Sequence, residues 1–205
     1  RNAEIRVYHM WDESMVGLAR NDREKHVFTF SNPAIYPPGA FGIKKYIIFN
    51  TREGMTRPGQ WYLDRTSGRI VYWPLKDEIM DKTIIMVPRL EKILNITGTK
   101  EKSVEQITIR GINFQVTTIP MKPAGWAGGS FEGAVSISYA DKCALENLEI
   151  LNVAGLGISA IQMNNSRILN CNIHHTGACG FKFVGSETLI SGNRIHNIGI
   201  NFPSS

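Results

Sequence analysis

Cysteine is scarce in this sequence, with only Cys143, Cys171 and Cys179 among 205 residues. An odd number of cysteines without a short spacing pattern argues against a disulfide framework and against a zinc site. We therefore expect these cysteines to be small core or turn residues. No apolar run reaches the length that a membrane-spanning helix requires, so no membrane span is expected.

Charged residues are few in the second half of the chain. Residues 111–205 contain five Lys or Arg and five Asp or Glu, so the net charge of +5 arises entirely within residues 1–110. There the basic residues are scattered among acids. A basic stripe with interleaved aromatic residues, as single-stranded nucleic acids require, is missing. This pattern indicates a mixed solvated surface, and no nucleic-acid partner is expected.

Unbroken runs with the 3.6-residue period of helical repeats are also absent. Instead, the third positions of four aligned segments are apolar and lie 36, 23 and 22 residues apart. The segments are ITIRGINF (107–114), CALENLEI (143–150), SRILNCNI (166–173) and TLISGNRI (188–195). A period in the low twenties marks a solenoid, in which each repeat buries its apolar face by stacking on its neighbours.

The fifth position of each segment is occupied by Asn or Gly, which tolerate a left-handed backbone and therefore suit a sharp corner between two short strands. These residues are Gly111, Asn147, Asn170 and Gly192. A third strand follows after a loop, as GAVSIS (133–138), LGISAI (156–161) and GFKFVG (180–185). Three strands per turn with this corner predict an all-β fold, a parallel β-helix.

Residues 1–86 are rich in β-strand patterns but do not repeat. Strands are expected at 4–10, 26–30 and 45–50, and 60–74 predicts a hairpin with its turn at Thr66-Ser67-Gly68. We expect a first domain over 1–86, a small sandwich or barrel lacking its start, and a second of β-helix rungs over 87–205. Residues 93–97 can supply the first rung's strand. Rungs are expected to continue in a longer parent protein, because the last one has no cap.

The rungs, with Asn147 and Asn170 at their corners, resemble the right-handed parallel β-helix proteins of the pectate-lyase superfamily. The run PGQWYLDRTSGRIVYWP (58–74), followed by a Val-Pro-x-Leu segment (87–90), is similar to bacterial β-helix glycoside hydrolases of the xylosidase and fucosidase type, which carry an inserted β-sandwich. The resemblance implies a secreted, periplasmic or cell-surface hydrolase that acts on a polysaccharide or oligosaccharide. It also implies that the catalytic carboxylates lie on later rungs.

In that superfamily the outer face of the third strands forms the carbohydrate groove. The two-residue period of a strand directs Val135, Ile158 and Phe181 inward, followed by Ile137, Ala160 and Phe183. Ser136, Ser159 and Lys182 then point outward into the groove. Small polar residues leave room for a sugar, and Lys182 is either a ligand for a hydroxyl or carboxylate or a solvated lysine.

The loops that border this groove are expected at 115–132, 151–156, 174–180 and from 196 onward. The first is much the longest, and long loops on a rigid scaffold are usually functional. It contains Trp126, either a platform for a sugar ring or an anchor packed on the solenoid. It also contains Glu132, which is the best-placed carboxylate. Glu132 is either a ligand for sugar hydroxyls, a weak candidate for the catalytic acid/base, or an ordinary surface glutamate.

His174 and His196 lie one repeat apart and are expected to stack at the start of successive loops, with His175 beside them. Imidazoles near a groove bind hydroxyls or relay protons, and a structural stack is the alternative. The spacing is not a zinc signature, so no metal and no cofactor is expected.

Glycoside hydrolysis uses two carboxylates, either close together or separated by room for a water molecule. Glu132 has no evident partner, since Asp141, Glu146, Glu149 and Glu187 fall at corners away from the groove. His9 and Asp12 of the first domain are further candidates to reach the groove, but the sequence does not determine their position relative to it. The catalytic pair is therefore unknown, and the chain alone is not expected to be active. A polysaccharide lyase or a non-catalytic carbohydrate-binding solenoid remains an alternative.

Overall fold

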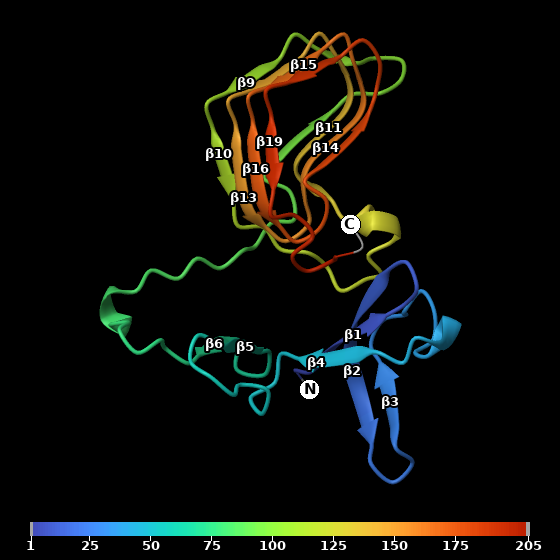
Figure 1. The fold of residues 1–205 in the computed structure, drawn as a ribbon, viewed down its shortest axis with the longest axis vertical. Coiled ribbons are helices and arrows are strands. Elements are labelled where there is room, and N and C mark those ends of the chain that lie inside the picture. Colours follow the sequence, from blue (N-terminus) through green and yellow to red (C-terminus); the bar gives the residue numbers. More distant parts are fainter. Residues whose placement is uncertain (1, 204–205) are drawn as a thin grey trace. The chain divides into compact units, whose positions relative to one another are not determined.

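A computed structural model describes residues 2–203 of the chain, which divide into two compact units (Figure 1). The first unit comprises Arg1–Met86 with Met121–Pro123, and the second comprises Val87–Pro120 with Ala124–Ser205. Nearly all regular structure is β-strand, interrupted by three single-turn 3-10 helices within the described residues. No helix among residues 2–203 is long and apolar enough to cross a membrane.

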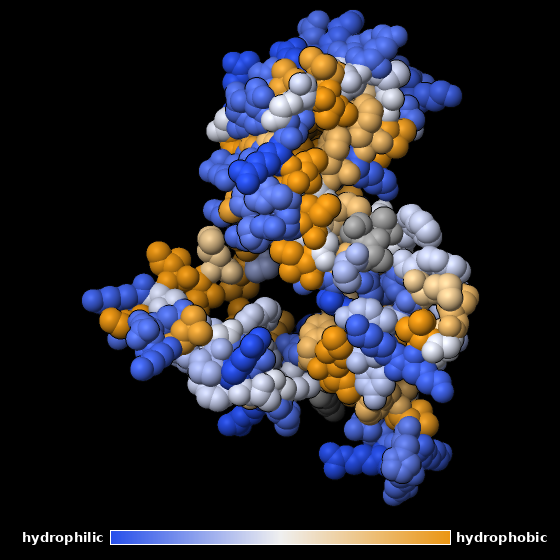
Figure 2. Space-filling view, viewed as in Figure 1, coloured by the Kyte–Doolittle hydropathy of each residue, from blue (hydrophilic) through white to orange (hydrophobic). Residues whose placement is uncertain are grey.

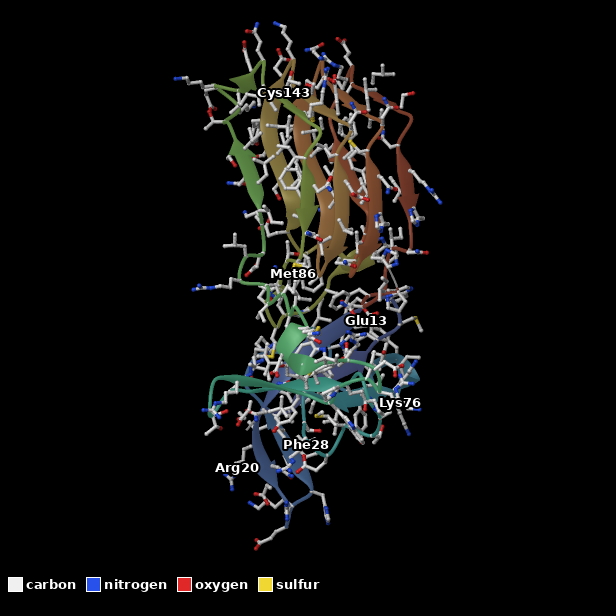
Figure 3. The ribbon with its side chains drawn as sticks, turned by 90° about the vertical axis from the view of Figure 1, so that its left-hand side faces the viewer. Glu13, Arg20, Phe28, Lys76, Met86 and Cys143 are labelled. Atoms are coloured by element: carbon white, nitrogen blue, oxygen red, sulfur yellow. The ribbon has the colours of Figure 1, made fainter. Side chains whose placement is uncertain are left out.

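The first unit contains a four-stranded antiparallel sheet in the order β3-β2-β1-β4. Its strands are β1 (Glu4–Tyr8), β2 (Glu13–Asp22), β3 (Val27–Phe30) and β4 (Tyr46–Phe49). Ile5 and Val7 on β1 pack with Val16 on β2 to form its small buried core. Figure 3 shows Arg20 and Phe28 on the protruding β2–β3 hairpin. The predicted strands at 4–10, 26–30 and 45–50 are confirmed, but β2, which is the longest strand of this unit, was missed.

The predicted hairpin is also confirmed, as β5 (Trp61–Asp64) and β6 (Arg69–Tyr72). Its turn ends at Gly68, whose φ of +67° is accessible to glycine without strain. The Asp64 carboxylate organises the turn by accepting hydrogen bonds from the Thr66 amide at 3.0 Å and from the Ser67 hydroxyl at 2.7 Å. An aspartate at the end of a strand therefore stabilises the turn by binding the residues that follow it.

The second unit is a parallel β-helix of three sheets, viewed roughly down its axis in Figure 1 and from the side in Figure 3. The first sheet contains β7 (Leu94–Thr97), β11 (Gly133–Asp141), β14 (Leu156–Asn164) and β17 (Phe181–Val184), with the short β8 (Val104–Glu105) beside β11. The second contains β9 (Thr108–Arg110), β12 (Ala144–Glu146), β15 (Arg167–Leu169) and β18 (Leu189–Ser191). The third contains β10 (Asn113–Gln115), β13 (Glu149–Val153), β16 (Asn172–Thr176) and β19 (Arg194–His196).

The registers confirm the repeat alignment read from the sequence. Leu145 pairs with Ile109 on one side and Ile168 on the other, and Ile168 pairs with Ile190. These columns face a continuous buried core that includes Cys143 and Cys171, so their expected role as small core residues is confirmed. Large apolar side chains of the last rung are more exposed, and orange residues lie among the polar ones on this unit in Figure 2.

Residues with left-handed backbone conformation form three columns at the corners of the rungs. The predicted column between the second and third sheets is confirmed, with φ between +52° and +68° at Gly111, Asn147, Asn170 and Gly192. Two further columns were not foreseen, because only some of their members are Asn. They are Gln106, Lys142, Asn165 and Glu187 before the second sheet, and Val116, Asn152, His175 and Asn197 at the end of the third.

Cross-rung hydrogen bonds support these corners. The Asn193 side chain accepts a hydrogen bond from the Cys171 amide at 2.8 Å and donates one to the Ile168 carbonyl at 2.9 Å. Ser166 accepts one from the Cys143 amide at 2.9 Å. Side chains thus satisfy backbone groups that the sheets leave unpaired at the corners.

Candidate functional site

The outer face of the first sheet carries one polar row across four parallel strands. Asn95, Ser136, Ser159 and Lys182 are register partners on β7, β11, β14 and β17. The residues predicted to point inward do so: Val135, Ile137, Ile158 and Ala160 are buried in the core, and Phe181 and Phe183 pack against it. We call the four polar residues the outer row.

The long loop places Trp126 beside one end of the outer row. Trp126 begins the 3-10 turn η3 (Trp126–Gly128), which follows Gly125 at φ +70°. A hollow of about 590 Å³ is lined by Trp126, Gly125, Gly129, Ser130, Cys179, Phe181 and Lys182. The Lys182 ammonium donates a hydrogen bond to the Gly129 carbonyl at 3.2 Å. The fold therefore brings together Trp126 and Lys182, which the sequence suggested separately as substrate-binding residues.

The loop is anchored by residues other than Trp126. Phe131 is buried, with its ring 4.6 Å from that of Phe202, and Ala124 is also buried. The Ser130 amide donates to the Ala124 carbonyl at 3.0 Å and closes the turn. The Trp126 side chain is 76% exposed. Of the two interpretations of Trp126, the structure disfavours the anchor and leaves an accessible indole face.

A second hollow, of about 190 Å³, lies on the same sheet. Its lining includes Asn95, Ser136 and Ser159 of the outer row, together with Lys92 and Glu132. The Glu132 carboxylate is exposed and lies 3.5 Å from the Lys92 ammonium. Ser159 borders this hollow and pairs in register with Lys182, which lines the first one. The two hollows are thus neighbours along the outer row.

Within residues 2–203, Glu132 is the one carboxylate that lines either hollow. Glu146 lies on the second sheet, where Arg167 and Arg110 bind its carboxylate and hold its pKa below the ordinary value. Glu149 lies on the third sheet beside His174. Glu146 and Glu149 thus lie on other sheets, and Glu132 has no second carboxylate beside it among the described residues that line the two hollows.

The histidines stack as predicted but lie on a different surface. His174 and His196 have parallel rings with centroids 5.0 Å apart, and His174 Nδ1 lies 2.7 Å from His175 Nδ1. We expected them in loops bordering the groove. That placement is wrong, because β13 and β16 run on to Val153 and Thr176, which puts His174 and His175 on the third sheet and His196 at the end of β19.

Neighbouring charges and rings act on His196, at one end of this histidine cluster. Burial, the Arg194 charge and the two neighbouring imidazoles lower the pKa of His196. These neighbours therefore disfavour the charged form of the His196 imidazole. Among the described residues, no group of three His, Cys, Asp or Glu has a geometry that could hold a metal ion.

His9 and Asp12 belong to a buried polar cluster in the first unit. His9 Nε2 lies 3.0 Å from the Ser14 hydroxyl, which accepts a hydrogen bond from the Ile35 amide at 3.0 Å. Burial lowers the pKa of His9 and raises that of Asp12, because burial disfavours the charged form of each group. Ser14 is fully buried and could not reach a substrate. Sequence reasoning missed Ser14, because nothing in its spacing distinguishes it from a surface serine.

Comparison with known families agrees with this architecture. The model of a family described as "Right handed beta helix region" matches residues 93–203, which is more than half of the chain. The chain belongs to the right-handed β-helix family. The described rungs, from β7 to β19, fall within the matched range.

A solved structure described as "Glycoside hydrolase" is similar to the β-helix chain, with a TM-score of 0.73 and 17% sequence identity. The match covers 98% of this chain and 45% of that one, so this chain spans less than half the length of the similar protein. At this identity the likeness shows the fold alone. None of the curated proteins compared matches the sequence.

Proposed function

We propose that this β-helix chain is a substrate-binding part of a glycoside hydrolase that acts on a polysaccharide or oligosaccharide. The observation that carries the proposal is the exposed indole of Trp126 beside Lys182, over an open hollow on the outer face of the first sheet. A flat aromatic face next to polar donors suits a sugar, which has an apolar ring face and hydroxyls at its edge.

Each residue of the groove has a role in this proposal. Trp126 stacks on one sugar ring, and Ser159 hydrogen-bonds to hydroxyls along the outer row, whereas the buried Ser136 hydroxyl already donates to the Gly133 carbonyl at 2.9 Å. Glu132 accepts hydroxyl hydrogen bonds or serves as the acid/base. In this proposal, the other carboxylate of the hydrolytic pair lies outside the residues that line the two hollows. A secreted, periplasmic or cell-surface location belongs to the same proposal.

His174, His175 and His196 would contact a substrate only if that substrate extends beyond the first sheet. Their third-sheet position separates them from both hollows. Their stacking geometry favours the structural alternative. The proposal therefore rests on Trp126, Glu132, Ser159 and Lys182.

Glycan binding by the chain, measured with and without Trp126, tests the proposal. Trp126→Ala is expected to weaken the binding of plant or host oligosaccharides about tenfold, which corresponds to the ~1.4 kcal/mol typical of one aromatic stacking contact. Trp61→Ala is the matched control, because Trp61 is also well exposed, at 61%, but lies on the β5–β6 hairpin. Equal losses in both variants, or no binding by the wild-type chain, would refute the proposed site.

Product analysis by mass spectrometry separates the reaction types. Products heavier by one water per cleaved bond identify a hydrolase. Products with an unsaturated uronate end identify a lyase on the same fold, for which a base and a cation near the substrate carboxylate would be needed. Binding that depends on Trp126, without cleavage of any glycan by either this chain or a protein extended by further rungs, identifies a carbohydrate-binding solenoid and overturns the hydrolase assignment.

A further inference from the structure

The outer row is long enough for more than one sugar. Adjacent strands of a sheet lie about 4.8 Å apart, so the four strands from β7 to β17 span about 14 Å across the row. Asn95, Ser136, Ser159 and Lys182 mark successive steps of that span. A ligand that follows the row therefore meets different side chains at its two ends.

The two ends of the row differ in charge. At one end, the Glu132 carboxylate faces the Lys92 ammonium at 3.5 Å, so the two charges offset each other. At the other end is Lys182, whose ammonium has three N–H donors and makes a hydrogen bond to the Gly129 carbonyl. The described residues that line this hollow include no carboxylate. The uncompensated positive charge of the row thus lies beside Trp126.

Glycines keep space open around this charge. A Cβ added at Gly129 would lie 3.7 Å from Lys182 Nζ and 3.0 Å from the Trp126 carbonyl. At Gly125 it would lie 3.1 Å from Ser130 Cβ. A side chain at Gly129 would thus extend from a point already in contact with the ammonium, whereas glycine leaves the ammonium accessible from solvent.

We propose that the groove selects an oligosaccharide that places an anionic sugar over Trp126 and Lys182 and neutral sugars over Ser159 and Ser136. This inference rests on the proposed function of the same surface. The indole supports the ring while the Lys182 ammonium forms a charge-assisted hydrogen bond with the anionic group. The paired Glu132 and Lys92 leave the opposite end without a net preference for charge. The shared ligand chemistry is a carboxylate or a sulfate on a pyranose ring.

Calorimetric titration tests the inference with uronate-containing oligosaccharides from glucuronoxylan and pectin, each compared with its carboxyl-reduced form. The wild-type chain is expected to bind at least one acidic form about fivefold more tightly than its neutral counterpart, the factor that an exposed ion pair supplies. Added salt should remove most of this difference, because exposed charges are screened. A sulfated oligosaccharide in a third titration distinguishes sulfate from carboxylate as the anion.

Variants assign the preference to one side chain. Lys182→Gln is expected to bring the acidic and neutral affinities together, and Lys182→Arg is expected to retain the preference for the acidic form. Lys142→Gln is the matched control, because Lys142 is an exposed lysine of the same β-helix that pairs with Asp141 outside both hollows. Circular dichroism verifies that each variant is folded.

The outcomes separate the inference from the function on which it rests. Equal binding of charged and neutral forms, with loss of both in Trp126→Ala, would overturn the anionic subsite and keep the carbohydrate site. A preference that Lys182→Gln leaves intact, or that Lys142→Gln also removes, would overturn the subsite as well. If the wild-type chain binds neither these oligosaccharides nor other glycans, the proposed carbohydrate-binding function is itself refuted.

Discussion

One column of the β-helix allows a direct test of rung stacking. Ile168 and Ile190 are the same residue type at the same position of consecutive rungs, and they are register partners. Ile168 lies between Leu145 and Ile190 and is 1% exposed, whereas Ile190 on the last described rung is 41% exposed. Replacing each in turn by alanine therefore removes identical atoms from two different environments.

The expected magnitudes follow from burial. Ile→Ala removes three carbon groups, worth about 2.4 kcal/mol of transfer free energy when fully buried. At Ile168 a sealed cavity adds to this value, and we expect the free energy of unfolding to fall by about 3–4 kcal/mol. At Ile190 only about 60% of the side chain is buried and no sealed cavity forms, so the expected loss is about 1.4 kcal/mol.

Urea unfolding followed by circular dichroism and by tryptophan fluorescence measures both variants against the parent chain. Because solenoid repeats can unfold separately, the two probes must give coincident transitions before free energies are compared. Losses of equal size at Ile168 and Ile190 would refute the reasoning that burial in a solenoid comes from the flanking rungs. A larger loss at Ile190 would refute the assigned rung order.

Three further outcomes are expected from the described contacts. Gly177→Ala should destabilise the chain by about 2 kcal/mol or more, because its Cβ would lie 2.0 Å from the Ala154 carbonyl; an unchanged urea midpoint would contradict this packing. The pKa of Glu146 is held below its ordinary value of 4.5 by Arg167 and Arg110, so its contribution to stability is present above pH 4.5 and is lost as pH falls through the lowered value. Glu146→Gln should flatten the acid limb of the stability profile, and a profile parallel to that of the parent would exclude this source. Burial and the neighbouring Arg194 lower the pKa of His196 below 6.5, so acidification below pH 6.5 should destabilise the chain less in His196→Gln; an identical loss in both proteins would assign the effect elsewhere.

Local patterns predicted some parts of the molecule and missed others for a physical reason. The β5–β6 hairpin was predictable because its turn residues act within a few positions of one another. Strand β2 was missed, because Glu13 and Ser14 are buried polar residues and Gly17 interrupts its apolar pattern. The added left-handed corners at Lys142 and His175 were missed because packing between rungs, and not residue preference, holds that backbone.

The sequence by itself determined the rungs, their inward columns and the outward row on the first sheet. A repeat of about one rung carries the same local pattern each time, and the two-residue period of a strand then fixes which side chains face the core. Only the tertiary structure decided that Trp126 lies beside Lys182 and that the stacked histidines occupy another sheet. A loop is shaped by distant contacts such as that between Phe131 and Phe202, and the length of a strand by its neighbours, so no local pattern records either.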